Sequence, residues 1–197
     1  MNRTTLMVWL PLLVSACAVS RVDPLTVPLS YTQNPKNAGL SGALGCNALS
    51  QVQVSDARSD KTLGVRVHES QPLKADVTAA SDPGVWVQQG MQSVLAQNGV
   101  IFQNKGPQLL VSIDALHTTE SIWHRSSYQA TIAITGRLES PSGKACWQET
   151  SRGQAENYGY SGSNEDYQET LNSALDTATL NLAQLQGFRD GLCKCSD

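Results

Sequence analysis

The chain has 197 residues, of which 40% are hydrophobic and 16% are charged, with 14 basic and 17 acidic side chains. This length and composition suit one globular domain with an additional segment better than two full domains. The net charge of −3 and the lack of any basic cluster in the sequence argue against a nucleic-acid partner, because duplex binding requires clustered lysine and arginine side chains.

The first residues are typical of an export signal. Arg3 supplies a positive charge, residues 6–14 form a short apolar run, and residues 15–16 are small, as expected before a cleavage point. A membrane-spanning helix needs about 20 apolar residues, whereas this run is shorter and contains Pro11. We therefore expect residues 1–16 to be removed as a signal peptide.

Cys17 follows this signal directly, and the segment Val14-Ser-Ala-Cys17 resembles the lipobox of bacterial lipoproteins. The resemblance implies cleavage before Cys17 and acylation of that cysteine with palmitate or a similar chain. An ordinary signal peptide followed by a chance cysteine is the alternative. In such lipoproteins an aspartate after the cysteine favours the inner membrane, and this chain has Ala18 instead. The resemblance therefore implies the periplasmic leaflet of the outer membrane of a Gram-negative bacterium.

Residues 17–45 are expected to form a lipidated tether to a single domain at residues 46–197. Prolines and glycines interrupt this segment, and neither a helical nor an alternating apolar period develops in it. Its 28 or so residues after Cys17 would extend at most about 90 to 100 Å. Residues 25–29 could add a short edge strand to the domain.

The domain is expected to follow the order strand, strand, helix, three strands, helix. Apolar residues alternate along the three longer strands, and they recur at helical spacing in the two helices. The first two strands are expected to be joined by a polar turn. This order predicts an α+β fold with a mainly antiparallel, or mixed, sheet of about five strands and two helices packed on one face. The expected strands are residues 52–54, 63–67, 108–117, 128–138 and 144–154, and the expected helices are residues 83–97 and 163–185.

The domain is also similar to the YajG-like lipoproteins. Besides the lipobox and the proline-bearing tether, the similarity rests on Asp56-Ala-Arg58 followed by Leu63-Gly64, on Asn98-Gly99 at a helix end, and on residues 109–113. It spans most of residues 50–185. The family offers no established catalytic residue, so the resemblance implies neither an enzymatic activity nor a cofactor.

Four cysteines remain besides Cys17, namely Cys46, Cys146, Cys193 and Cys195. An exported compartment oxidises thiols, so two disulfides are predicted among them. A bridge between Cys193 and Cys195 would close a very small ring, so each is expected to pair with either Cys46 or Cys146. A redox pair or metal site is the less favoured alternative, because Cys-x-Cys differs from the Cys-x-x-Cys of thiol oxidoreductases.

Catalytic, cofactor-binding and metal-binding motifs do not stand out in the sequence. His117 and His124 flank Glu120, but they are seven residues apart, whereas a zinc-protease helix spaces its histidines by four. Two surface histidines are the favoured interpretation. Serine and cysteine residues do not occur in a nucleophile motif such as Gly-x-Ser-x-Gly. The chain is therefore predicted not to be an enzyme.

Two segments rich in aromatic residues are the best candidates for contact with a partner. Trp123 lies near the connection between two expected strands, and Tyr158 and Tyr160 lie in a glycine-containing loop before the last helix. Aromatic side chains on loops often form contact surfaces for proteins or sugars. The alternative is that the tyrosines only cover the start of the helix.

The sequence thus favours a non-catalytic binding or assembly module of the cell envelope, held in the membrane by its lipid and contacting an envelope protein or glycan. One alternative is an auxiliary lipoprotein of a lipid or lipopolysaccharide transport system, or an activator of a peptidoglycan synthase. Another is an envelope hydrolase, which would need an acidic pair or a nucleophile in a pocket.

Overall fold

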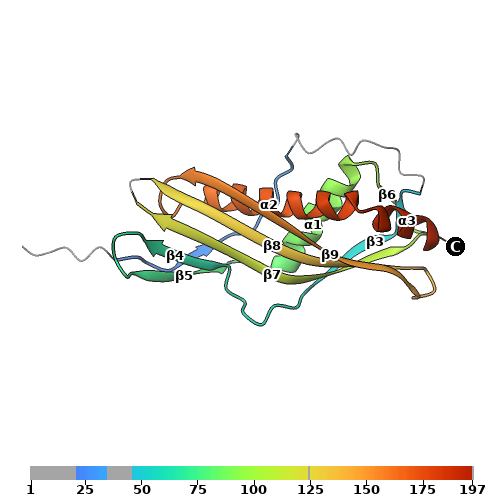
Figure 1. Cartoon of the computed structure of the whole chain (residues 1–197), viewed down its shortest axis with the longest axis horizontal. Coiled ribbons are helices and arrows are strands. Elements are labelled where there is room, and N and C mark those ends of the chain that lie inside the picture. The colour runs from blue at the N-terminus through green and yellow to red at the C-terminus, as the bar shows by residue number, and fades with distance from the viewer. Residues whose placement is uncertain (1–20, 35–45, 124, 197) are drawn as a thin grey trace, which may run out of the picture.

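The computed structural model describes residues 21–34, 46–123 and 125–196, so the predicted signal peptide and Cys17 lie outside the described residues. This part of the chain forms a mixed seven-stranded sheet, a two-stranded ribbon and three helices. The predicted α+β class is confirmed, whereas the expected five strands and two helices were too few. Figure 1 shows an elongated molecule whose helices lie along one face of a long sheet.

The elements are unevenly long, and the longest strands come late in the chain. The seven-stranded sheet has the order β1-β5-β4-β7-β8-β9, with β3 also paired to β7. In chain order the elements are β1 (Leu25–Val27), β2 (Ala48–Leu49), β3 (Gln51–Asp56), β4 (Gly64–His68), β5 (Lys74–Ala79), α1 (Pro83–Gln97), β6 (Ile101–Phe102), β7 (Gln108–Ile122), β8 (Ser126–Glu139), β9 (Ala145–Gly159), α2 (Asn164–Gln184) and α3 (Gln186–Lys194).

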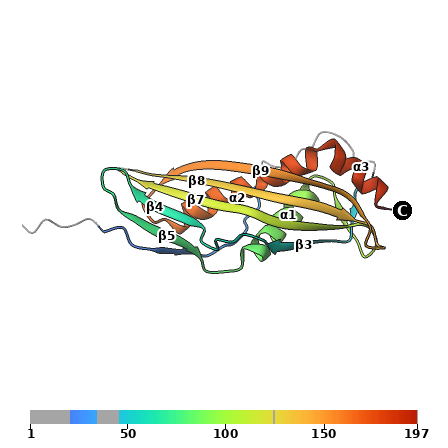
Figure 2. The ribbon, with the colours of Figure 1, turned by 60° about the horizontal axis from the view of Figure 1, so that its bottom comes forward.

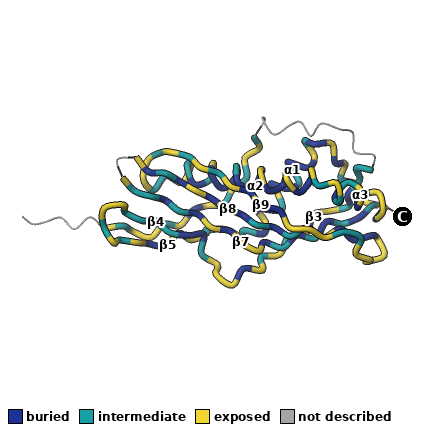
Figure 3. Tube along the Cα trace, in the orientation of Figure 1, coloured by how far each residue is buried: buried dark blue, intermediate teal, exposed yellow. Residues whose placement is uncertain are grey.

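The three long strands β7, β8 and β9 form the predicted antiparallel meander. Leu109 pairs with Leu138 and Ile113 with Ile134, and all four side chains are fully buried. Successive side chains of a strand point to opposite faces, so the residues between them lie on the opposite face of the sheet, which carries mainly threonine, glutamine and serine. Figure 3 shows buried and exposed positions alternating along these strands.

The first two expected strands of the domain, at residues 52–54 and 63–67, correspond to β3 and β4, but these strands do not pair with each other. Both β3 and β4 run parallel to β7, with β3 beside residues 108–113 and β4 beside residues 118–122. The physical reason is that β7, with 15 residues, is long enough to pair with two short strands placed end to end. Between them, residues 59–62 loop away from the sheet (Figure 1).

The antiparallel partner of β4 is instead β5, which the sequence analysis did not identify. Its inward-facing residues include Ala75 and Val77, both buried. Small alanine side chains give a weak alternating signal, so this strand is recognisable only once its neighbours are known.

The Asp56-Ala-Arg58 signature lies at the start of the connection from β3 to β4. The Nε and Nη2 atoms of Arg58 each donate to one carboxylate oxygen of Asp56, both at 2.9 Å. The Nη1 atom donates to the backbone oxygens of Thr62 at 2.8 Å and Leu116 at 3.3 Å. The hydrogen bond from Arg58 holds the pKa of Asp56 below its usual value. The signature therefore stabilises the connection between β3 and β4.

The Leu63-Gly64 pair that follows has an equally local explanation. Leu63 is fully buried. A Cβ atom at Gly64 would lie 1.7 Å from the backbone oxygen of Thr118, and the φ angle of Gly64 is +150°. Only glycine lets the start of β4 approach β7 so closely.

The helices α1 and α2 pack against the sheet, as predicted, and they also pack against each other. The Asp82 side chain caps α1 by accepting from the Gly84 N–H at 2.7 Å, and the Ser163 side chain caps α2 by accepting from the Asp166 N–H at 3.2 Å. Trp86 is buried between the helices, where its Nε1–H donates to a side-chain oxygen of α2. Within the described residues, the helices all lack the combination of length and hydropathy that crossing a bilayer requires.

The third helix, α3, was not predicted. It has nine residues and contains Gly187 and Gly191, which lower helix propensity. Its Phe188 packs edge-on against Trp147 of β9, with ring centroids 5.2 Å apart. Tertiary packing therefore stabilises a helix that local sequence disfavours.

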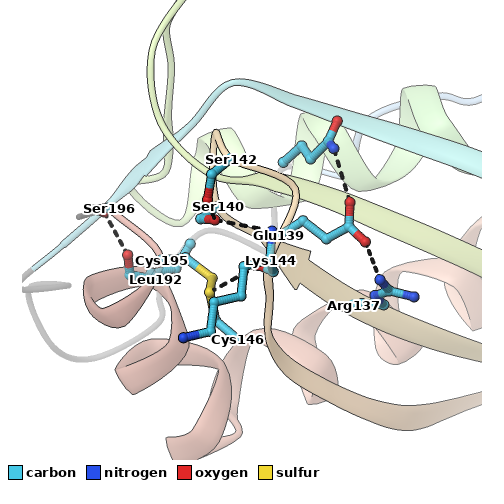
Figure 4. Close-up of a disulfide and its surroundings, with 10 residues drawn as sticks. Arg137, Glu139, Ser140, Ser142, Lys144, Cys146, Leu192, Cys195 and Ser196 are labelled. Carbon is cyan, nitrogen blue, oxygen red and sulfur yellow. Dashed lines mark hydrogen bonds and ion pairs between the residues drawn. A yellow bond between two sulfur atoms is a disulfide. The ribbon is translucent and has the colours of Figure 1, made fainter.

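Two disulfides hold α3 to the rest of the domain. The structure joins Cys46 to Cys193, and it joins Cys146 at the start of β9 to Cys195 at the end of α3, as Figure 4 shows. The two Cα–Cα distances are 5.0 and 5.8 Å. Each cysteine of the C-terminal pair is thus bonded to a cysteine distant in sequence, as expected.

The segment before the domain contributes a strand to the sheet. The expected edge strand is confirmed as β1, which pairs in parallel with β5 and buries Val27 completely. Further along, the Tyr31 hydroxyl donates to Asp176 of α2 at 2.7 Å. Residues 25–31, which lie in the expected tether range 17–45, therefore pack on the domain.

Candidate functional site

The structure brings the three aromatic residues singled out from the sequence to one place. Trp123, Tyr158 and Tyr160 line a cavity of about 270 Å³, together with Arg125 and Asp166. The exposed fractions of the three aromatic side chains are 52%, 61% and 89%. We call Trp123, Arg125, Tyr158 and Tyr160 the aromatic end. Whether it contacts a partner stays a prediction.

The antiparallel meander explains why these residues meet. Ser126, the first residue of β8, pairs with Gly159, the last residue of β9. The β7–β8 connection and the β9–α2 loop therefore lie at the same end of the sheet. Both views in Figures 1 and 2 place these two connections side by side, opposite the end that carries α3.

A buried carboxylate, Glu120 of β7, lies beneath the aromatic end. Its side chain is fully buried on the face of the sheet that the helices cover. The Nε atom of Arg66 on β4 donates to Glu120 Oε2 at 2.6 Å, and the Tyr167 hydroxyl of α2 donates to the same oxygen at 3.0 Å. Glu120 thus ties two strands to a helix.

The second carboxylate oxygen of Glu120 is held equally well. It accepts from the hydroxyl of Ser126 at 2.9 Å and from the backbone N–H of Gly162 at 2.8 Å. Beside it, the Tyr128 hydroxyl donates to the backbone oxygen of Tyr160. We call Glu120, Arg66, Ser126, Tyr128 and Tyr167 the Glu120 network.

The network has the electrostatics of a structural ion pair. Burial raises the pKa of Glu120, but the hydrogen bonds from Arg66 and from the Gly162 N–H outweigh burial and hold that pKa below its ordinary value. Burial, followed by the Glu120 charge and its hydrogen bond, raises the pKa of Tyr167. Burial likewise raises the pKa of Tyr128 to about 12. At neutral pH the acid is therefore ionised and the two tyrosines remain neutral.

The Glu120 network was not predicted from the sequence. In the sequence, Glu120 was considered only because it lies between His117 and His124. The spacing held one signal: Leu116, Thr118 and Glu120 stand at every second position, as residues on one face of a strand do. The structure buries all three side chains. A carboxylate is expected in such a buried row only when a cation that pairs with it is known. Here that cation is Arg66, which lies 54 residues away in sequence.

The network fixes the backbone of the β9–α2 loop. Three of its contacts go to consecutive loop residues: the Tyr160 oxygen, the Ser161 hydroxyl, which accepts from Arg66 at 3.2 Å, and the Gly162 N–H. Gly162 has a φ angle of +72°, a conformation that favours glycine. The loop is therefore held in place while the Tyr160 side chain remains exposed.

Arg66 also holds the segment that leads to the N-terminus. Its Nη1 atom donates to the backbone oxygen of Asp23 at 2.8 Å. Asp23 precedes β1, so this contact fixes the point at which the N-terminal segment joins the domain. That point lies beside the β9–α2 loop, since the same guanidinium contacts Asp23 and Ser161.

The two histidines that the structure describes do not line this site. His117 is exposed on β7, with its Nε2 3.3 Å from the Thr119 hydroxyl. His68 is the last residue of β4, with its Nδ1 3.2 Å from the Ser70 hydroxyl. Residue 124 lies outside the described residues. In the part of the chain that the structure describes, no group of three histidine, cysteine, aspartate or glutamate side chains is placed to hold a metal ion.

Comparison with known proteins shows only distant likenesses. Family models do not match the sequence, and neither do curated proteins. A DUF330-family protein from Xanthomonas campestris is similar in structure, with 11% identity and a TM-score of 0.44 over 87% of this chain and 94% of that one. A minor lipoprotein from Acinetobacter baumannii is similar with 12% identity and a TM-score of 0.40, over 70% of this chain and 88% of that one.

Proposed function

We propose that the protein is a YajG-like, non-catalytic lipoprotein of the cell envelope. A lipid on Cys17 anchors it in the periplasmic leaflet of the outer membrane, and the aromatic end is its binding surface. The observation that carries this proposal is the convergence of Trp123, Tyr158 and Tyr160 around one cavity, with the backbone of the loop that carries Tyr160 held in place.

The physical chemistry of the aromatic end suits binding. Tryptophan and tyrosine offer large contact areas and lose little conformational entropy when they are immobilised. The Glu120 network has already restrained the backbone beneath them, so a ligand does not need to order that loop. The ionised Glu120 is fully engaged by Arg66 and its other donors, which supports a structural role for this acid over acid–base chemistry.

The disulfides agree with the proposed location. Two bridges join sites far apart in the sequence, and such bridges persist in oxidising compartments such as the periplasm. They also restrain the end of the molecule opposite the aromatic end, where α3 packs on β9.

The binding surface can be tested by photocrosslinking in cells. A photoreactive amino acid replaces Trp123 or Tyr160 in the full chain, and matched controls carry it at Val85 or Ile101. The controls are comparably exposed, at 51% and 55%, but belong to α1 and β6. We expect crosslinked adducts at Trp123 and Tyr160, and their loss when Cys17→Ala removes the anchor. Adducts formed equally or preferentially at the control positions would contradict the proposed surface.

A further inference from the structure

We propose that the aromatic end contacts the bilayer itself, at the headgroup region of the leaflet in which the Cys17 lipid is inserted. This inference rests on the proposed lipid anchor and names the partner of the same surface. The sequence alone favoured a protein or glycan for these aromatic side chains. The position at which the N-terminal segment joins the domain favours the membrane.

The length of chain between the lipid and the domain is short. Five residues separate Cys17 from Asp23, so the six steps of chain between them span at most about 20 Å. Arg66 fixes the Asp23 backbone oxygen at 2.8 Å and also contacts Ser161, which lines the aromatic cavity. An anchored protein must therefore keep its aromatic end close to the membrane surface.

The opposite end of the molecule lies beyond this reach. Strand β7 runs from one end of the sheet toward the other with 15 residues, which corresponds to about 50 Å. The Cys146–Cys195 bridge and α3 lie at that far end (Figures 2 and 4). The anchor length thus selects the aromatic end as the part of the domain nearest the bilayer.

The exposed side chains at the near end have the chemistry of a membrane interface. Among the described residues, five large hydrophobic side chains are more than half exposed, and the three aromatic ones are all in the aromatic end. Tryptophan and tyrosine are enriched where an apolar ring and a polar tip meet the headgroup layer. Arg125 in the same cavity wall can pair with lipid phosphate.

Electrostatic attraction to anionic lipid is not the main contribution. The Tyr158 hydroxyl donates to Glu156 at 2.7 Å, and the Tyr160 N–H donates to Asp166 at 3.2 Å, so acidic groups lie beside the aromatic side chains, and Asp166 lines the same cavity as Arg125. Because the nearby charges are of both signs, burial of the aromatic rings is the dominant attraction of this surface to the bilayer. Contact with the bilayer would therefore persist at high salt.

The test uses the full-length lipidated protein reconstituted into vesicles of phosphatidylethanolamine and phosphatidylglycerol. The acyl chains carry bromine atoms near the headgroups, because bromine quenches the fluorescence of a tryptophan that it touches. The variants are Trp123→Phe and, as a matched control, Trp147→Phe, which removes a ring packed against α3 at the far end. Flotation of wild type and of Cys17→Ala with the vesicles reports the anchor separately.

We expect the wild type and Trp147→Phe to lose most of the Trp123 emission in brominated vesicles, at low and high salt, and Trp123→Phe to show no loss. A wild type that floats but is not quenched would overturn the bilayer contact while leaving the lipid anchor intact. A wild type that does not float would overturn the proposed function, and the bilayer contact with it.

Discussion

Glu120 illustrates how a single buried charge can organise a binding surface. Removing a carboxylate from water is costly unless a cation and hydrogen-bond donors replace the lost hydration. Here Arg66, Tyr167, Ser126 and the Gly162 N–H provide that replacement. The same contacts hold the loop that carries Tyr160, so stability and the geometry of the surface depend on one residue.

Glu120→Gln is expected to lower the free energy of unfolding by about 3 to 5 kcal/mol, because it leaves the Arg66 charge buried without its partner. Urea denaturation at pH 7 measures the change. The matched control is Glu69→Gln, which alters an exposed carboxylate in the β4–β5 turn and should change stability by less than about 0.5 kcal/mol. Equal losses from the two variants would contradict the role of Glu120.

The stability that Glu120 contributes should also depend on pH. Its pKa in the folded protein lies below the ordinary value of 4.5. The contribution is therefore fully present above that value and is lost as the pH falls through the folded-state pKa. Urea denaturation of wild type and Glu120→Gln at a series of pH values should show the difference shrinking below pH 4.5. A difference that grows on acidification would show that the pKa is raised.

The helix α2 approaches strand β9 very closely at Gly153. A Cβ atom at Gly153 would lie 1.9 Å from the backbone oxygen of Ala174 and 2.5 Å from the backbone nitrogen of Ala178. The helix backbone therefore rests on the strand at a position where no side chain fits. Ala155 and Ser151, which flank this position on the same face, are also small.

Gly153→Ala is expected to push α2 away from the sheet and to lower the unfolding free energy by about 1 to 3 kcal/mol or more. Gly136→Ala on β8 is the matched comparison, because its new methyl group would meet the flexible end of Leu182 at 3.0 Å. Thermal unfolding followed by circular dichroism should show a larger loss for Gly153→Ala. The reverse order would be inconsistent with the close approach of α2.

Local sequence was sufficient for the elements that carry their own signals. The helices α1 and α2 and the alternating strands β7 and β8 were predicted from nearby residues. Strand pairing was not, because the parallel partners β3 and β4 are chosen by the length of β7. The helix α3 escaped prediction because its stability comes from Trp147 and the disulfides.

The candidate site, too, was predictable from the sequence only in part. The exposed aromatic residues were identifiable because tryptophan and tyrosine are conspicuous by type, although Tyr158 lies in β9 and not in the loop where it was expected. Their meeting at one end of the sheet followed from the meander. The Glu120 network was not predictable, because it assembles residues from β4, β7, β8 and α2 that no sequence spacing relates.

The whole molecule has two ends with different roles. The Glu120 network and the aromatic end occupy one, beside the point where the N-terminal segment joins the domain. The two disulfides and α3 occupy the other. The disulfides therefore stabilise the fold without approaching the proposed binding surface.

Replacing Cys46 and Cys193 together by serine is expected to lower the unfolding free energy by about 2 to 4 kcal/mol. Replacing Cys146 and Cys195 together should cost less, because that bridge spans 49 residues of sequence and the first spans 147. Urea denaturation under non-reducing conditions measures both. Either double variant being as stable as the wild type would contradict a stabilising role for its bridge.

The central claim is that Cys17 carries the lipid that places the aromatic end at the membrane. The most direct measurement is the intact mass of the protein extracted from the membranes of the cells that produce it. We predict a mature chain that begins at Cys17 and carries the added mass of acyl chains, and a Cys17→Ala variant without that mass. A membrane-extracted wild type that retains residues 1–16, or that has a free Cys17 thiol, would contradict it.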